Sequence, residues 1–165
     1  MATRAKSILG AATLPDGVVF QEPSSVNVLV NDRYPGMVYV FKDTGTRIKL
    51  GVGFYIPPNY VGTPIIRLIW LTVLTSGDVR WEADLTSIAD GESGDPSADQ
   101  ESIPLTVTVP GTARLLKYTD LAFTAGTFAP NDFVQGVIAR DGTEAADTAA
   151  GSVYLYDAQF LFSDT

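Results

Sequence analysis

The stretch RIKLGVGFYI, from Arg47 to Ile56, decides the fold class. Its apolar side chains occupy every second position, at Ile48, Leu50, Val52, Phe54 and Ile56. A period of two places one face of a β-strand on a core and the other face toward solvent. Pro57 and Pro58 follow directly and end the strand, because proline cannot donate a hydrogen bond to a ladder.

Strand patterns and turn signals continue along the rest of the chain. The turn Thr75–Asp78 predicts a hairpin. Further strands are expected over 26–30, 37–42, 65–74, 79–84, 103–109, 115–123, 133–140 and 153–162. No segment shows a helical period with caps, although 83–93 and 142–150 could each hold one helical turn. We therefore predict an all-β protein: one antiparallel two-sheet β-sandwich, a jelly roll, over 17–165, after an extended N-terminal arm over 1–16.

Composition excludes most catalytic chemistry. The chain has no cysteine and no histidine, which excludes disulfides, thiolate metal sites and the common serine and cysteine triads. A net charge of -8 opposes nucleic-acid binding, and no apolar run could span a bilayer. A glycosidase pair built on Glu82 is conceivable, but nothing in the spacing selects that acid. We expect a protein that is not an enzyme, has no cofactor, binds neither nucleic acid nor membrane, and is synthesised in a host cytoplasm.

Two acidic segments are the candidate metal sites. The loop from Asp90 to Glu101 lacks the ligand spacing of an EF-hand, so a solvated loop is favoured over a Ca²⁺ site. In the second segment, Asp141, Glu144 and Asp147 could converge on a cation. Alternatively, Arg140 could pair with Asp147 and pin the turn. The pinned turn needs no ligand and is the favoured interpretation.

Aromatic side chains allow a carbohydrate-binding interpretation, since exposed rings stack on sugar rings. The strand patterns place Trp81 on a core face and Trp70 in a strand that is apolar on both faces, so both are expected to be packing residues. Tyr55 lies on the outward face of its strand. It is therefore the better candidate for an exposed stacking residue or an interface residue.

Two stretches of the chain carry a resemblance to known proteins. They are YIPPNYVGTPIIRLIWLTVLTSGDVRWEADLTSIADGES over 55–93 and RDGTEAADTAAGSVYLYDAQFLF over 140–162. Together they resemble small jelly-roll virion structural proteins of tailed bacteriophages. The resemblance implies a capsid decoration (cement) protein that stabilises the outer capsid surface. The implied partners are further copies of the same chain, in a homotrimer, and the major capsid protein. The alternative is a tail or head-fibre module that binds a host glycan.

The terminal strand suggests where such an oligomer would form. Alternation places Tyr154, Tyr156, Phe160 and Phe162 on one face of this strand. The other face, with Val153 and Leu155, then needs cover from a neighbouring subunit, unless the strand is buried within one monomer. The full set of predicted interface residues is Arg4, Lys6, Ile8, Leu9, Tyr55, Ile69, Leu71, Val153 and Leu155. In an isolated monomer, the arm is expected to be disordered.

Overall fold

A computed structural model of the chain describes residues 3–8, 19–21, 38–94, 101–124 and 127–164. These residues form strands and turns without any helix, so none of them lies in a helix that could cross a membrane. The strands are β1 (Thr3–Ser7), β2 (Val19–Gln21), β3 (Val38–Phe41), β4 (Arg47–Tyr55), β5 (Tyr60–Thr72), β6 (Asp78–Ile88), β7 (Glu101–Thr108), β8 (Lys117–Ala122), β9 (Phe133–Asp141) and β10 (Val153–Asp164).

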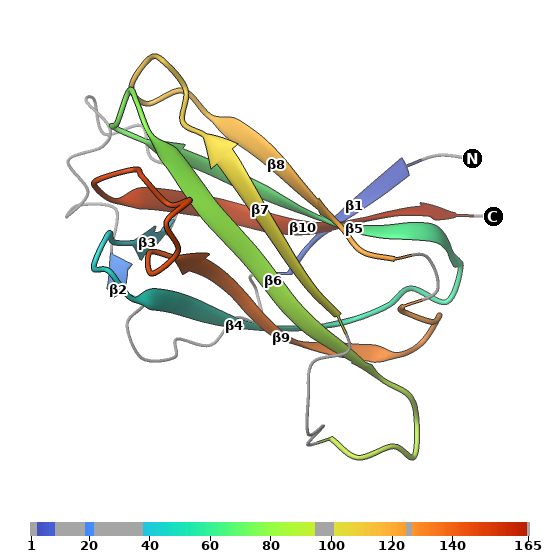
Figure 1. Cartoon of the computed structure of the whole chain (residues 1–165). Coiled ribbons are helices and arrows are strands. Elements are labelled where there is room, and N and C mark those ends of the chain that lie inside the picture. Colours follow the sequence, from blue (N-terminus) through green and yellow to red (C-terminus); the bar gives the residue numbers. More distant parts are fainter. Residues whose placement is uncertain (1–2, 9–18, 22–37, 95–100, 125–126, 165) are drawn as a thin grey trace.

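The strands build two antiparallel sheets that face each other (Figure 1). The first sheet has the order β2-β3-β10-β5-β8, and the second has the order β4-β9-β6-β7. The chain crosses repeatedly from one sheet to the other, as between β3 and β4 or between β9 and β10. The predicted all-β jelly roll is confirmed. The segment 83–88, where a helical turn was considered, instead continues strand β6, and the strand expected over 26–30 lies outside the described residues.

The two tryptophans lie at the centre of the core, as predicted. Trp70 and Trp81 are both 0% exposed, and their ring centroids are 5.8 Å apart. The Trp70 indole donates a hydrogen bond of 2.9 Å to Thr119 Oγ1. The predicted inward face of β4 is buried along its whole length, from Ile48 to Phe54. The alternation in the sequence therefore locates this face of the core correctly.

Strand β10 corrects one prediction. Its register with β5 shifts between Leu155 and Asp157, so that Tyr156 is the extra residue of a β-bulge. A bulge changes which face the following residues occupy, because side chains alternate along a strand. Val153 and Leu155 consequently point into the same core as Phe160 and Phe162, with all four at 8% exposure or less. These two predicted interface residues are core residues of their own sandwich. Tyr154 and Tyr156 instead pack on the outer face.

The N-terminal arm corrects a second prediction. Thr3–Ser7 pairs antiparallel with the end of β10, and the amide of Ile8 donates a hydrogen bond of 2.8 Å to the carbonyl of Ala158. Ile8 itself is only 2% exposed. For residues 3–8 the expected disorder is therefore wrong: the backbone pairs with an open edge of β10, and one apolar side chain enters the core. Leu9 lies outside the described residues.

Candidate functional site

The outer face of the second sheet ends in a pair of aromatic rings, one exposed and one half-buried. Strands β4 and β9 pair over their full length, and Tyr55 lies opposite Phe133 at one end of this ladder. Tyr55 is 64% exposed, Phe133 is half-buried, and the ring centroids are 5.1 Å apart. Gly53 leaves room for this arrangement, because a Cβ atom there would lie 2.9 Å from Cζ of Phe133. The Phe133 ring therefore rests on the backbone of β4.

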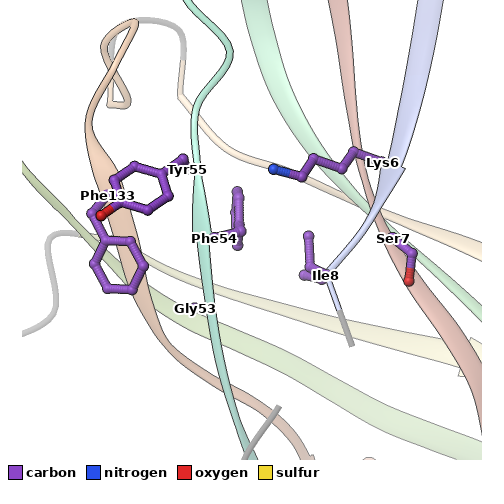
Figure 2. A pocket seen from close by; sticks show the side chains of 7 residues that line it. All are labelled: Lys6, Ser7, Ile8, Gly53, Phe54, Tyr55 and Phe133. Atoms are coloured by element: carbon purple, nitrogen blue, oxygen red, sulfur yellow. The ribbon is translucent and has the colours of Figure 1, made fainter. Parts of the chain in front are cut away.

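Two hollows flank the aromatic pair. The first, which we call the β1 hollow, has a volume of about 340 Å³ and lies between β1 and β4 (Figure 2). It is lined by Lys6, Ser7, Ile8, Gly53, Phe54, Tyr55 and Phe133. The second, which we call the loop hollow, has a volume of about 250 Å³. It is lined by Tyr55, Ile88, Ala89, Asp90, Gly91, Asn131 and Phe133.

The floor of the β1 hollow is apolar and its rim is charged. Ile8 and Phe54 form the floor and belong to the hydrophobic core. Lys6 reaches from β1 across the hollow toward the side occupied by Tyr55 (Figure 2). Ser7 also lines the hollow, but its hydroxyl already donates a hydrogen bond of 2.5 Å to Asp157 Oδ1. Lys6 is thus a charged group of this hollow that is available to a ligand.

Two charged side chains and one amide around the hollows have no partner among the described residues. Within the described part of the chain, Lys6, Asp90 and Asn131 make no side-chain hydrogen bond or ion pair, and all three are exposed. Polar groups near a ligand site that bond to nothing in the protein are free to bond to a ligand. The aromatic pair therefore has an unpaired cation on one side and an unpaired carboxylate and amide on the other.

The backbone that presents Asp90 and Asn131 is held in place by other hydrogen bonds. Ser87 Oγ donates to Asp132 Oδ2 at 2.6 Å, and the amide of Ala89 donates to Glu92 Oε2 at 2.9 Å. The amide of Asn131 donates to the carbonyl of Ile56 at 3.2 Å. These bonds fix the loop hollow without using the side chains that would face a ligand.

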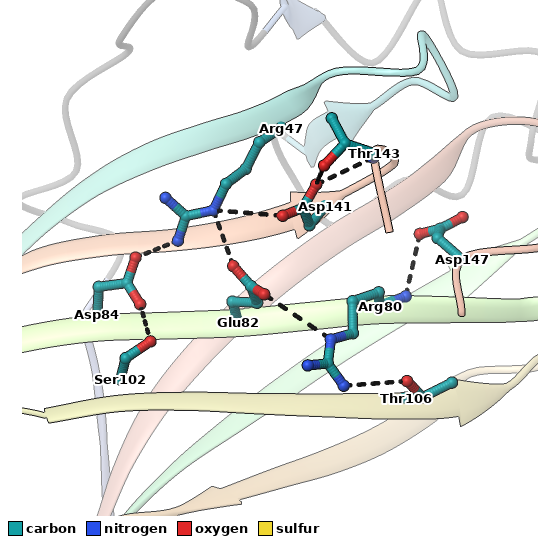
Figure 3. A network of polar contacts seen from close by, with 9 residues as sticks. All are labelled: Arg47, Arg80, Glu82, Asp84, Ser102, Thr106, Asp141, Thr143 and Asp147. Carbon is teal, nitrogen blue, oxygen red and sulfur yellow. Dashed lines mark hydrogen bonds and ion pairs between the residues drawn. The ribbon is translucent and has the colours of Figure 1, made fainter. Parts of the chain in front are cut away.

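The opposite end of the β4–β9 ladder is a network of paired charges (Figure 3). Arg47 Nε lies 2.8 Å from Glu82 Oε2, and its Nη2 contacts Asp84, which also accepts from Ser102. The pKa of Arg47 is raised: burial acts to lower it, but the hydrogen bonds and charges of these two carboxylates outweigh burial. Glu82, the acid considered for a glycosidase pair, is therefore held by arginine.

The buried partner of Asp147 is Arg140, as the favoured interpretation of the turn predicted. Arg140 Nη2 lies 2.7 Å from Asp147 Oδ1, and the two side chains are 0% and 1% exposed. Arg140 Nε donates to the second oxygen of Asp147 at 2.9 Å, and its Nη atoms donate to the carbonyls of Phe41, Ala149 and Gly151. All five guanidinium donors are satisfied, so the pinned turn is confirmed.

The three candidate metal ligands do not converge. Asp141 accepts hydrogen bonds from the Thr143 amide at 2.9 Å and from its hydroxyl at 2.6 Å, while Glu144 is exposed. Burial acts to raise the pKa of Asp141, but these hydrogen bonds and the charges of Arg47 and Arg80 lower it below its ordinary value. Among the residues that the structure describes, no group of three acids could hold a metal ion.

The remaining predicted interface residues lie in two places. Arg4 is exposed on β1, next to Lys6. Leu71 is 3% exposed and Ile69 is half-buried on the outer face of the first sheet. Leu71 packs with Val38 and Val40 under Tyr154 and Tyr156, so the chain itself covers part of this face.

The structure brings three of the predicted interface residues, Lys6, Ile8 and Tyr55, to the β1 hollow. Sequence reasoning missed Phe133 and Asn131, which also line the site, and treated Asp90 only as part of an acidic loop. The sequence does show a turn before β9, and the first residue of that strand is Phe133. The pairing of this ring with Tyr55 could not be read from local patterns.

Known proteins share the fold but not a recognisable sequence. No protein-family model matches this sequence, and no curated protein does. A CBM35 structure from Paenibacillus barcinonensis is similar, with a TM-score of 0.54 and 12% identity over 98% of this chain and 99% of that one. A family 35 carbohydrate binding module from Clostridium thermocellum gives a TM-score of 0.49 and 12% identity, with 99% of each chain covered. At such low identity the likeness establishes the fold alone. It is a jelly-roll β-sandwich.

Proposed function

We propose that the protein is a non-catalytic module that binds a glycan across Tyr55 and Phe133. The observation that carries the proposal is the 64% exposure of Tyr55 beside a half-buried ring, between two hollows with unpaired polar side chains. An aromatic ring gives a sugar an apolar surface to stack on, and directed polar groups bond its hydroxyls. Lys6, Asp90 and Asn131 supply such groups on both sides of the rings.

The shared fold supports this proposal. The structure with the TM-score of 0.54 is a carbohydrate-binding module, and it matches nearly the whole of both chains. One fold serves many functions, so the argument depends on the site, and the likeness only adds to it. Among the interpretations of the sequence, the site favours the glycan-binding module over the capsid decoration protein. The decoration role, the homotrimer, the major capsid protein as partner and the virion location stay predictions.

The charges of the second sheet support binding rather than hydrolysis. Glycoside hydrolysis needs one carboxyl group that donates a proton and a second carboxylate that acts as base or nucleophile. Glu82 and Asp84 are the neighbouring acids on the sheet surface, and both bind Arg47. They lie along β6 opposite Ala139 and Val137, whereas Phe133 of the aromatic pair is opposite Ile88 at the end of that strand. Among the described acids near the rings, Asp132 accepts a hydrogen bond from Ser87 and Glu92 accepts one from the amide of Ala89, which leaves Asp90 without a second unpaired carboxylate beside it.

A binding experiment with a matched tyrosine control tests the proposal. The intact protein is measured against a panel of immobilised polysaccharides that includes xylan, cellulose, β-1,4-galactan, mannan and pectin. Tyr55→Ala should weaken binding to the recognised polysaccharide about thirtyfold, which corresponds to about 2 kcal/mol. Tyr118→Ala removes a tyrosine that is 59% exposed on the other sheet, and it should leave binding unchanged. Absence of binding to the whole panel, or equal losses in the two variants, would refute the proposal.

A further inference from the structure

The candidate site has two hollows with Tyr55 between them, and this arrangement constrains the shape of a ligand. Tyr55 and Phe133 line both hollows, while the other lining residues belong to one hollow or the other. We infer that the ligand is the interior of a linear glycan chain, with one sugar in each hollow and at least one on Tyr55. The inference rests on the proposed function and adds the class of glycan.

The sizes of the hollows favour a chain over a single sugar. Their volumes of about 340 Å³ and about 250 Å³ lie at or below the lower end of the roughly 300–1,000 Å³ typical of ligand pockets. Neither hollow alone has room for a long glycan chain. A ligand that fills both must cross Tyr55, whose exposed ring separates them. Recognition of a chain end would require one hollow that closes around the last sugar, and this site continues on both sides of its ring.

The polar groups of the two hollows differ in the hydrogen bonds that they can make, and this difference favours one orientation of a bound chain. The Lys6 ammonium in the β1 hollow can only donate hydrogen bonds, whereas the Asp90 carboxylate in the loop hollow can only accept them. The β1 hollow therefore fits a sugar that presents ring, glycosidic or carboxylate oxygens. The loop hollow fits a sugar that presents hydroxyl groups, with Asn131 able to bond in either sense. A chain bound across both hollows would lie in one preferred direction.

A length series tests whether both hollows are used together. Fragments of one to six sugars are prepared from each polysaccharide that binds in the panel, and each is titrated against the intact protein by calorimetry. Affinity should rise at least about tenfold from one sugar to three, and then level off. A single sugar that binds as tightly as the six-sugar fragment would overturn the inference and leave the proposed function standing. Absence of binding to every polysaccharide in the panel would overturn both.

Modified chain ends test whether the interior is recognised. A six-sugar fragment reduced to the alditol at one end, and a second fragment modified at the other end, should bind within about twofold of the unmodified fragment. A large loss with either fragment would show that a chain end is bound, and would overturn the inference.

Substitutions in the two hollows give a third measurement. Lys6→Gln and Asp90→Asn should each weaken binding of the six-sugar fragment about fivefold, because each removes a charged hydrogen-bonding group from one hollow. The matched controls are Lys42→Gln and Asp43→Asn, which change exposed residues just before the opposite end of β4 and should have no effect. If only one of the two hollow variants weakens binding, the ligand uses a single hollow and the inference is wrong.

Discussion

The two ends of the β4–β9 ladder are built from opposite kinds of surface. At the end where Arg47 lies opposite Asp141, the charged side chains of the network in Figure 3 are largely buried, and each has a partner. At the other end, where Tyr55 lies opposite Phe133, an aromatic ring is exposed, and the side chains of Lys6, Asp90 and Asn131 have no partner within the described chain. The same pair of strands therefore holds the sandwich together at one end and offers a surface to a ligand at the other.

Energetics explain why the two ends differ. A charge taken out of water is costly unless a partner and additional hydrogen bonds satisfy it. Arg140 meets this condition, since one carboxylate and three carbonyls accept all five of its donors. An exposed tyrosine ring contributes little to the core, because its apolar surface stays in water. Under the proposed function, this ring and the unpaired groups around it gain partners from the ligand.

The largest expected effect is a loss of stability at the end of the ladder that holds the buried Arg140–Asp147 pair. Asp147→Ala would leave the Arg140 charge buried without its carboxylate, and it would also remove the acceptor of the Arg80 amide. We expect a loss of about 3–5 kcal/mol in the free energy of unfolding, measured by urea denaturation. Glu144→Ala, an exposed acid in the same turn, should change the stability by less than about 0.5 kcal/mol. Similar losses in both variants would mean that the turn as a whole, and not the buried pair, is responsible.

Local patterns in the sequence predict the Arg47–Asp141 end of the ladder better than the Tyr55–Phe133 end. The alternation from Ile48 to Phe54 locates a buried strand face, and the short separation between Arg140 and Asp147 suggests a pinned turn. The aromatic pair joins Tyr55 to a residue far along the chain, and only the register of β4 against β9 brings the two together. Register across a sheet depends on tertiary packing, which one strand's own pattern does not encode.

Strands β1 and β10 show two further limits of sequence patterns. Thr3–Ser7 has no apolar alternation, and it forms a strand because an edge of β10 is available to pair with it. In β10, the bulge at Tyr156 reverses the faces that strict alternation assigns to Val153 and Leu155. A bulge inserts one residue without a strong local signal, so the error affects every residue on one side of it.

A smaller effect is expected at the Tyr55–Phe133 end of the ladder, and it would show whether Phe133 belongs to the site. Gly53→Ala places a Cβ atom 2.9 Å from the tip of the Phe133 ring, so the flexible ring must move. Binding to the recognised polysaccharide should weaken about fivefold, or about 1 kcal/mol, while the melting temperature changes little. Gly111→Ala is the control, since a Cβ atom there would meet nothing within 4 Å. If Gly53→Ala lowered stability and left binding unchanged, Phe133 would be a packing residue and would not be part of the site.

The smallest expected effect is a loss of stability at low pH that comes from Asp141, at the Arg47–Asp141 end of the ladder. The pKa of Asp141 is lowered in the folded protein, because the hydrogen bonds from Thr143 and the charges of Arg47 and Arg80 outweigh burial. A carboxylate with a lowered folded pKa stabilises the protein above its unfolded pKa of about 3.9, and this contribution is lost as the pH falls through the folded value. The melting temperature of the wild-type protein should therefore fall below about pH 4.

Comparison of Asp141→Asn with the wild-type protein isolates this contribution. The amide does not ionise, so the variant should be less stable than the wild type at neutral pH, and its melting temperature should fall less on acidification. Glu101 has a lowered pKa as well, since burial acts to raise it but hydrogen bonds from Thr124 and Thr127 prevail, so part of the acid dependence should remain in the variant. Asp43→Asn, at an exposed acid, should follow the wild-type curve. If Asp141→Asn also followed it, Asp141 would contribute nothing to the acid dependence, and other carboxylates such as Glu101 would be responsible for it.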